Sequence, residues 1–445
     1  MTIDTSPLLT DLYELNMVQA YLDHGENGEA VFEFFVRSLP ARRGFLMAAG
    51  LDSVVSFLEG ARFTPDEVAW LRATKRFKDN ALDWLAGFRF AGSVHAMPEG
   101  TVFFPHEPIL RITAPLAQAQ LVESRIINIL HYQSMIASKA ARMVLAADGK
   151  VLSDFGLRSA HGAEAGMFAS RASYIAGFGG AANVLAGERY GLPIVGTMAH
   201  SFVQMHGDEM KAFEAFARSR PDNVVLLIDT YDTERGARRV VELAPKLAKD
   251  GIKIHGVRID SGDLVAMSKS VRGILDAGGL KDTIILVSGG INEDTILKHK
   301  AAGAPIAGYG IGANLTTSQD APTLDCAYKL QEYKGEPRRK LSEGKQTWPG
   351  RKQVWRSLAT DGRMNADTLS VETDEPTGDP LIALVMKDGK RLNPAPSFDA
   401  MRENAKRNLS QLPDKLQRLE AFDYPVKVSD TLKSLAQKAD AAAGR

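Results

Sequence analysis

Six short apolar segments recur between residues 151 and 309 of the chain, and stretches with helical spacing separate them. The segments are 151–155, 194–196, 224–228, 255–259, 284–287 and 306–309. Between them, residues 233–249 and 264–277 place apolar side chains on one side of a helix. Short strands that alternate with helices predict βαβ units around a parallel sheet. Six such units in one run favour a closed barrel over an open sheet.

The composition is that of a globular enzyme. The 445 residues are 44% hydrophobic and 24% charged, which suggests two or three domains with a sizeable core. The 54 basic residues balance the 54 acidic ones, and this argues against a nucleic-acid partner. The single cysteine, Cys326, is interpreted as a small buried residue. No apolar run of about 18 residues and no basic leader occur, so we expect no membrane partner and a cytoplasmic location.

The alternating region divides the rest of the sequence into an N-terminal and a C-terminal part. Residues 1–145 mix predicted helices, over 7–21 and 116–147, with short strands over 93–114, and predict an N-terminal α/β domain. Residues 146–333 predict the barrel domain. Residues 334–445 are expected to be a C-terminal appendage that completes the N-terminal domain and the surface. Its basic start, 334–356, is interpreted as a loop-rich solvated surface, with a phosphate contact as the alternative.

Polar residues or glycines follow all six predicted strands. In a parallel barrel the active site lies at the carboxyl ends of the strands, so these residues are candidates for one site. The first predicted strand contains Asp154 near its end, and the residues that follow the other five begin with Thr197, Asp229, Asp260, Ser288 and Gly310. One such strand end would mean little, but six in succession predict a site.

Two glycine turns and two arginines favour an anionic substrate. Gly289-Gly290 and Gly310-x-Gly312 would bring backbone N–H groups close to a phosphate, although a tight turn explains either loop alone equally well. Arg158 and Arg258 can bind a carboxylate or phosphate through two hydrogen bonds, and the alternative is a surface salt bridge. No P-loop motif is present.

His200 is the candidate for covalent chemistry. It follows a strand end and can act as a base, an acid or a nucleophile toward phosphorus; the alternative is a structural histidine. Asp260 and Asp263 can assist Mg²⁺ that arrives with substrate phosphates, with helix capping as the alternative for Asp263. No group of residues has zinc spacing, so no metal held by the protein alone is predicted.

Several segments resemble the motifs of nicotinate phosphoribosyltransferases. They are TDLYEL at 10–15, DFGLR at 154–158, ASR at 169–171, NVLAG at 183–187, GTMAHS at 196–201, VRIDSGD at 257–263 and YGIG at 309–312. Each motif is weak alone, but their order along the chain makes the set specific to this family.

The resemblance implies a type II phosphoribosyltransferase, in which an N-terminal α/β domain accompanies an incomplete parallel α/β barrel of the TIM type. It implies a step of NAD salvage that joins nicotinate to phosphoribosyl pyrophosphate, giving nicotinate mononucleotide and pyrophosphate. ATP is the implied co-substrate, hydrolysed through a phosphohistidine at His200, and Mg²⁺ accompanies the phosphates. The resemblance also implies a homodimer.

The resemblance further implies roles for individual residues. Tyr13 of one subunit is expected to stack on the nicotinate ring in the other subunit. Arg258 would pair with the nicotinate carboxylate beside Thr197, and Arg158 would lie in the same pocket or at a donor phosphate. Asp260 is expected to be catalytic together with His200. The residues expected at the ribose phosphate are Gly289, Gly290, Gly310, Gly312 and Thr317.

Three departures from the family pattern concern the substrate loops. Ala313 stands where a threonine is expected after the YGIG motif, and residues 159–168 and 179–182 match only loosely. Two alternatives stay open at this point. One is a nicotinamide-using phosphoribosyltransferase, and the other is a non-catalytic nucleotide-binding protein on the same fold.

Overall fold

The computed structural model describes residues 6–442, and the chain divides into two compact units. The barrel unit is Lys139–Asp320, and the terminal unit comprises the chain up to Ser138 and from Ala321 onward. The sequence placed these divisions after residues 145 and 333. The first lies within helix α6 (Glu123–Ala147), and the second follows β12 (Cys326–Tyr333), which pairs with β1 (Glu29–Val36) of the terminal unit. Such long-range pairing leaves no mark in the local sequence pattern.

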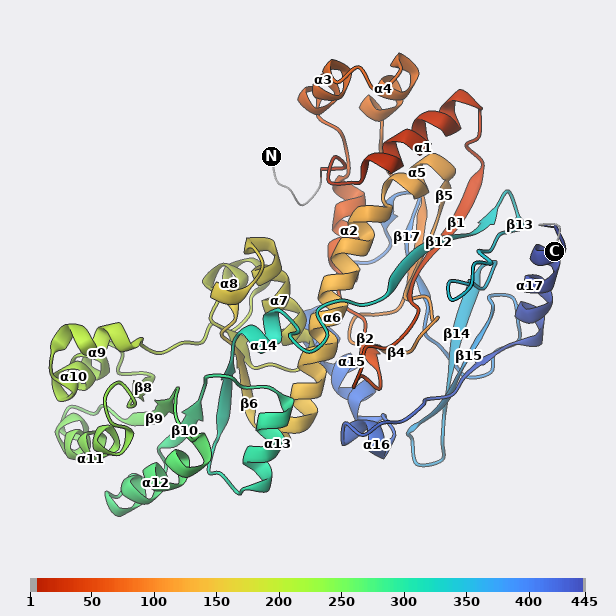
Figure 1. The fold of residues 1–445 in the computed structure, drawn as a ribbon. Coiled ribbons are helices and arrows are strands. Elements are labelled where there is room, and N and C mark those ends of the chain that lie inside the picture. The colour runs from red at the N-terminus through yellow and green to blue at the C-terminus, as the bar shows by residue number, and fades with distance from the viewer. Residues whose placement is uncertain (1–5, 443–445) are drawn as a thin grey trace. The chain divides into compact units, whose positions relative to one another are not determined.

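The barrel unit contains a curled sheet of six parallel strands (Figure 1). At one edge of the sheet, Ile194 forms an isolated parallel bridge to Ala181. Within the described residues, no strand pairing joins this edge to β8 at the opposite edge, so the sheet does not close. The predicted incomplete barrel is therefore confirmed, and the closed barrel that the strand count favoured is wrong. The run at 194–196 is too short to form a strand, and Ile194 is 59% exposed. The strands, in sheet order, are β7 (Gly180–Ala181), β6 (Val151–Asp154), β11 (Gly308–Ile311), β10 (Ile284–Val287), β9 (Ile254–Ile259) and β8 (Val224–Leu227).

Helices connect these strands and begin at side-chain caps. Asp232, Asp263 and Asn292 accept hydrogen bonds from backbone N–H groups at the starts of α11, α12 and α13. The predicted bounds of the helices over 233–249 and 264–277 are confirmed. The helical elements of the barrel unit after α6 are η2 (Leu157–Ser159), α7 (Ala163–Ala176), α8 (Val184–Tyr190), α9 (His200–His206), α10 (Glu209–Ser219), α11 (Thr233–Lys249), α12 (Leu264–Ala277), α13 (Glu293–Ala301) and α14 (Ala313–Thr316).

The terminal unit is built on a seven-stranded sheet, in the order β13-β12-β1-β5-β3-β17-β18. Its inner strand β1 pairs with β12 on one side and β5 on the other, and it is buried over Ala30–Val36. The predicted helix at the N-terminus begins at Leu12 rather than at Pro7. The other elements of this layer are β3 (Ser93–Ala96), β5 (Leu110–Pro115), β13 (Glu336–Pro337), β17 (Ala383–Lys387), β18 (Lys390–Arg391), α1 (Leu12–Asp23), α2 (Leu51–Gly60), α3 (Pro65–Ala73), α4 (Asp79–Ala86) and α5 (Leu116–Leu121).

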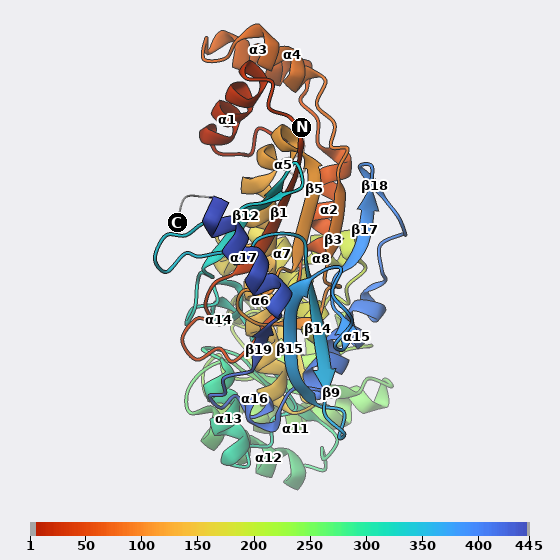
Figure 2. The same ribbon diagram turned by 90° about the vertical axis from the view of Figure 1, so that its right-hand side faces the viewer.

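The C-terminal part of this unit forms a second sheet in the order β16-β14-β15-β19, whose longest strands lie side by side in Figure 2. The β2–β4 pair and three helices complete the unit. The elements are β2 (Leu46–Met47), β4 (Val102–Phe103), β14 (Lys352–Leu358), β15 (Met364–Val371), β16 (Asp379–Pro380), β19 (Val426–Val428), α15 (Phe398–Ser410), α16 (Asp414–Gln417) and α17 (Asp430–Ala442).

The expectation of a loop-rich, solvated basic segment is wrong for the end of 334–356. Lys352 is buried, and its Nζ lies 2.6 Å from Glu33 Oε2. Arg356 is also buried, and its Nη2 lies 2.5 Å from Asp367 Oδ2. Glu33 is far from Lys352 in sequence, and Asp367 lies opposite Arg356 on the neighbouring strand β15; both cations are thus neutralised and not available to phosphate.

Candidate active site

His200 and Asp260 face each other beyond the carboxyl ends of β8 and β9. His200 is the first residue of α9, and its Nδ1 lies 3.0 Å from the hydroxyl of Thr230. Its Nε2 lies 3.9 Å from Asp260 Oδ2, and its side chain is 39% exposed. The imidazole is thus oriented by Thr230 on one nitrogen, beside a carboxylate on the other, and open to a substrate.

Asp229, to which the sequence alone gave no role, bonds to the backbone of Asp260. Asp229 Oδ2 accepts hydrogen bonds from the backbone N–H of Asp260, at 2.9 Å, and from the Ser261 hydroxyl, at 2.7 Å. The hydroxyl of Ser288 donates to Asp260 Oδ1. Asp229 Oδ1 is buried and has no hydrogen-bond partner within the described part of the chain. The sequence feature that could have identified Asp229 as a site residue is its position just after β8.

Arg258 provides a partly buried positive charge next to these carboxylates. Its Nη2 donates to the Met198 carbonyl at 2.9 Å, and the guanidinium lies 5.9 Å from the centre of the Phe155 ring. Its Nε is buried and has no partner among the described residues. Burial lowers the pKa of Arg258, while the Asp260 and Asp229 carboxylates act in the opposite direction. An arginine stays charged nonetheless, since its ordinary pKa is above about 12.

Arg158 adds a second cation to this region. It lies exposed on η2, and its charge also lowers the pKa of Arg258. The structure therefore brings the two predicted anion partners close enough for their charges to interact. Two guanidinium groups with unused donors suit a planar anion.

The glycines at the strand ends allow close packing of the site. Gly289 has φ +90°, and a Cβ there would lie 2.2 Å from the Asp260 carbonyl oxygen, whereas Gly290 has φ +67° and open space around it. A Cβ on Gly310 would lie 2.4 Å from Cε2 of the Phe155 ring. Gly289 and Gly310 are thus needed to place Asp260 and Phe155, and Gly290 leaves room for a ligand.

Replacing Gly310 with alanine is expected to displace the Phe155 ring, and with it the Arg258 side chain above it. We expect a destabilisation of about 1–3 kcal/mol and a loss of activity of about tenfold. Thermal unfolding and steady-state kinetics measure both. Gly273→Ala on α12 is the matched control, because a Cβ there meets nothing within 4 Å. Wild-type stability and activity in Gly310→Ala would contradict this role of the glycine.

For the other residues predicted at the substrates, the structure shows the local environment but no contact with the His200–Asp260 group. The Thr317 hydroxyl donates to the Ala313 carbonyl at 2.8 Å, so a phosphate would have to compete for that proton. Gly312 directly precedes α14. Thr197 donates to the Met198 carbonyl at 3.4 Å, and Tyr13 lies on α1 in the terminal unit and is 46% exposed.

Asp263 caps a helix, which was the alternative to binding Mg²⁺. Its carboxylate accepts hydrogen bonds from the backbone N–H groups of Val265 and Ala266 at the start of α12. No group of three or more potential metal ligands occurs among residues 6–442. Within the same range, no helix is long and apolar enough to cross a membrane.

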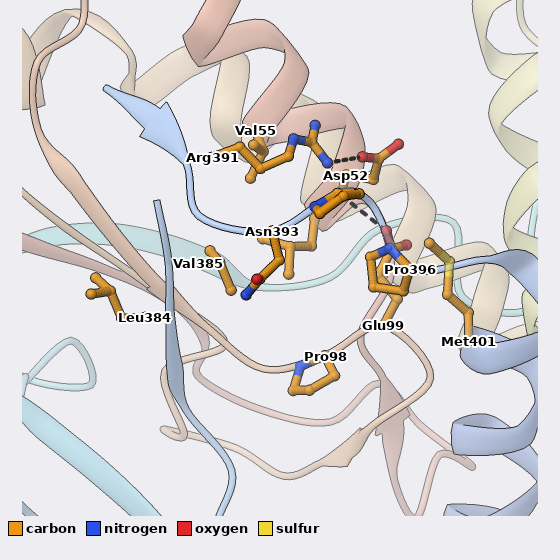
Figure 3. Close-up of a pocket in the computed structure, with 12 residues that line it drawn as sticks. Asp52, Val55, Pro98, Glu99, Leu384, Val385, Arg391, Asn393, Pro396 and Met401 are labelled. Atoms are coloured by element: carbon orange, nitrogen blue, oxygen red, sulfur yellow. Dashed lines mark hydrogen bonds and ion pairs between the residues drawn. The ribbon is translucent and has the colours of Figure 1, made fainter. Parts of the chain in front are cut away.

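A separate pocket of about 180 Å³ lies wholly within the terminal unit (Figure 3). Its charged groups are already partnered: Arg391 pairs with Asp52 at 2.6 Å, and the Glu99 carboxylate accepts the N–H groups of Gly50 and Asp52. Val55 and Met401 form part of its apolar wall. This pocket therefore lacks free charges for a phosphorylated substrate, in contrast to the strand ends of the barrel unit.

Comparison with known proteins decides the family. The model of the nicotinate phosphoribosyltransferase (NAPRTase) family matches residues 151–343, and the models of its N-terminal and C-terminal domains match 8–131 and 377–436. Nicotinate phosphoribosyltransferase pncB2 of Mycobacterium tuberculosis is 48% identical over 428 residues, covering 96% of this chain and 92% of the relative. This chain belongs to the nicotinate phosphoribosyltransferase family.

Other members agree with the assignment to nicotinate phosphoribosyltransferases, so the predicted family is confirmed. The Bacillus subtilis nicotinate phosphoribosyltransferase is 38% identical over 363 residues, covering 80% of this chain and 74% of that one. The crystal structure of human nicotinic acid phosphoribosyltransferase superimposes with a TM-score of 0.87 at 29% identity, covering 96% of this chain and 99% of the human one.

Proposed function

We propose that this chain converts nicotinate and phosphoribosyl pyrophosphate into nicotinate mononucleotide and pyrophosphate, as a step of NAD salvage. We further propose that ATP hydrolysis to ADP and phosphate drives this transfer through a phosphorylated His200. The observation that carries the proposal is the grouping of His200, Asp260 and Arg258 at the strand ends of a chain in this family.

In the transfer, the bond between the anomeric carbon and the pyrophosphate oxygen breaks, and a bond from that carbon to the pyridine nitrogen forms. Positive charge develops on the ribose ring, and negative charge leaves with pyrophosphate. The protein's main contribution is to hold the two reactants in position and to offset the charge of the leaving group. The paired donors of Arg258 suit the nicotinate carboxylate, and Phe155 lies beneath that guanidinium.

In the ATP-dependent step, a His200 ring nitrogen attacks the γ-phosphorus, ADP leaves, and water later cleaves the phosphorus–nitrogen bond to release phosphate. When Nδ1 donates to Thr230, Nε2 carries the lone pair, and it faces Asp260 and solvent in this rotamer. The Asp260 carboxylate would stabilise positive charge on the ring. The exposure of His200 is compatible with access by a nucleotide.

Mg²⁺ fits the same place when it arrives with the substrate phosphates. Asp229 Oδ1 is buried and has no partner among the described residues, and Asp229 Oδ2 accepts the backbone N–H of Asp260. One or two carboxylates together with phosphate oxygens form the usual Mg²⁺ environment. The cation would offset the charge of the phosphates, and these two aspartates would hold it, in place of the Asp260–Asp263 pair considered from the sequence.

The two arginines favour nicotinate over nicotinamide. A carboxylate can accept from the free Arg258 donors and neutralise charge near Arg158. A neutral amide would add nothing to the negative charge that Asp260 and Asp229 already place near Arg258, and it would leave the repulsion between the two guanidinium groups uncompensated. The nicotinamide alternative is therefore the weaker one.

We propose a homodimer in the cytoplasm, where ATP is available. Exposed apolar side chains support a protein partner in each unit: Leu9, Leu12 and Tyr13 in the terminal unit, and Val184 and Leu185 in the barrel unit. Light scattering of the purified protein would give the mass of two chains, and a single-chain mass would overturn the dimer.

The test of the function is product formation from nicotinate and phosphoribosyl pyrophosphate, with and without ATP, with and without a Mg²⁺ chelator, and with nicotinamide in parallel. We expect nicotinate mononucleotide, a higher rate with ATP, and no product with the chelator. Preference for nicotinamide would overturn the role of the arginines. Binding of both ligands without product would leave a non-catalytic protein.

A further inference from the structure

Two buried carboxyl groups lie beside Tyr13, and the proposed reaction gives them no role. Glu14 follows Tyr13 on α1 and is fully buried, and Glu123 begins α6. The side chain of Gln120 on α5 donates to both, with Nε2 lying 2.7 Å from Glu14 Oε2 and 2.9 Å from Glu123 Oε2. A single amide group bridges the two carboxyls, so they lie close together; α1 and α5 also pack against each other (Figure 1).

The charges of this pair are not balanced. Lys329 Nζ lies 3.3 Å from Glu123 Oε1, but Glu14 forms no ion pair within the described residues. Its Oε1 is buried and has no hydrogen-bond partner there. Two ionised carboxylates with one partly exposed lysine would leave a buried negative charge, which is costly in an apolar environment. Binding of one proton removes that charge.

Within the described part of the chain, no second cation pairs with either carboxyl. Burial, and then the charge of Glu123, raise the pKa of Glu14 to about 7. Burial is also the largest cause of the raised pKa of Tyr13, and Glu14 is the next. The other titratable groups that act on the pair are Asp11 and Tyr21 on or next to α1, and Tyr328 on β12. The Tyr13 hydroxyl also bonds to both carboxyls, and this acts to lower their pKa values.

We propose that the Glu14–Glu123 pair carries a single proton, held on Glu14, and that this proton keeps the first turn of α1 in place so that Tyr13 stays in position for binding nicotinate. The inference rests on the proposed function and on the contact of Tyr13 with nicotinate that the family resemblance implies. Loss of the proton leaves an ionised Glu14 in the interior, and the turn must then shift toward water. Glu14 is a positioning residue that couples nicotinate affinity to pH.

The stability of the protein provides a readout that is independent of activity. Because the pKa of Glu14 in the folded chain is about 7, against an ordinary 4.5, its contribution to stability is complete below about pH 4.5 and is lost as the pH rises through about 7. The Glu14→Gln variant keeps a neutral side chain at every pH. We expect the unfolding temperature of the wild type to fall, relative to this variant, between pH 5 and pH 8.

The decisive measurement is the KM for nicotinate between pH 6 and pH 8.5. We expect it to rise about tenfold in the wild type and less than about twofold in Glu14→Gln, with kcat changing little in either. Glu26→Gln is the control, because the bonds of Glu26 to Tyr333 and Lys334 lower its pKa and keep it ionised throughout this range. This variant should follow the wild-type profile.

Hydrogen–deuterium exchange over residues 10–23 tests the movement of α1 directly. After correction for intrinsic base catalysis, exchange should accelerate with pH in the wild type and not in Glu14→Gln. An unchanged KM profile in Glu14→Gln, or exchange that follows intrinsic rates alone, would overturn the inference. Absence of nicotinate mononucleotide at every pH would instead refute the proposed function, and the exchange and unfolding data would still test the proton on Glu14.

Discussion

Replacing Arg258 with alanine is expected to lower kcat/KM for nicotinate about a thousandfold, which corresponds to about 4 kcal/mol. The variant removes a partly buried cation whose Nε has no protein partner and whose charge suits the substrate carboxylate. Nicotinamide has no carboxylate to lose, so its kcat/KM should change much less. Steady-state kinetics with both bases measure this difference.

Two further variants separate charge from geometry in this prediction. Arg258→Lys keeps the charge but loses the planar pair of donors, and we expect only partial recovery. Arg218→Ala removes an exposed arginine of α10 that pairs with Glu214 and Asp250, and it should leave both bases unaffected. Equal losses for nicotinate and nicotinamide in Arg258→Ala would show that the arginine supports the fold rather than the carboxylate.

Replacing His200 with alanine is expected to abolish the effect of ATP on the reaction. The rates with and without ATP should become equal, while the ATP-independent rate stays within about threefold of the wild type. Transfer of label from the γ-phosphate of ATP to the protein should also disappear. The reason is that His200 provides the one exposed imidazole beside Asp260 in the described site.

The control for this variant is His206→Ala on the same short helix. His206 Nδ1 bonds to the Phe202 carbonyl at 2.8 Å, so its role is within α9 rather than toward a substrate. It should keep both ATP stimulation and labelling. Persistent labelling in His200→Ala would place the phosphoryl group on another residue.

Much of the barrel unit could be predicted because its signals are local. The helices over 233–249 and 264–277 were predicted at their observed bounds, since apolar spacing and the capping aspartates act within a few residues. The parallel strands that carry Asp229 and Asp260 followed from short apolar runs that end in polar residues. Their alignment at one edge follows from the right-handed βαβ connection.

Other features of the site could not be predicted from such local patterns. Gly310 was predicted to lie in a phosphate-binding turn. Its backbone lies against the Phe155 ring, which is far away in sequence. Asp263 was considered beside Mg²⁺, whereas Asp229 is the aspartate that reaches Asp260. These outcomes depend on which loops meet after folding, and no local spacing encodes that.

By itself, the sequence determined the family, the alternation of strands and helices, and the strand ends at which the chemistry is expected. These properties arise from periodicity and turn chemistry over short distances. Only the tertiary structure decided that the sheet stays open beside Ile194, that Arg356 is neutralised by Asp367, and that Glu14 and Glu123 share one amide donor. Each of these depends on how strands and helices pair and on which groups become buried, and both exist only in the folded chain.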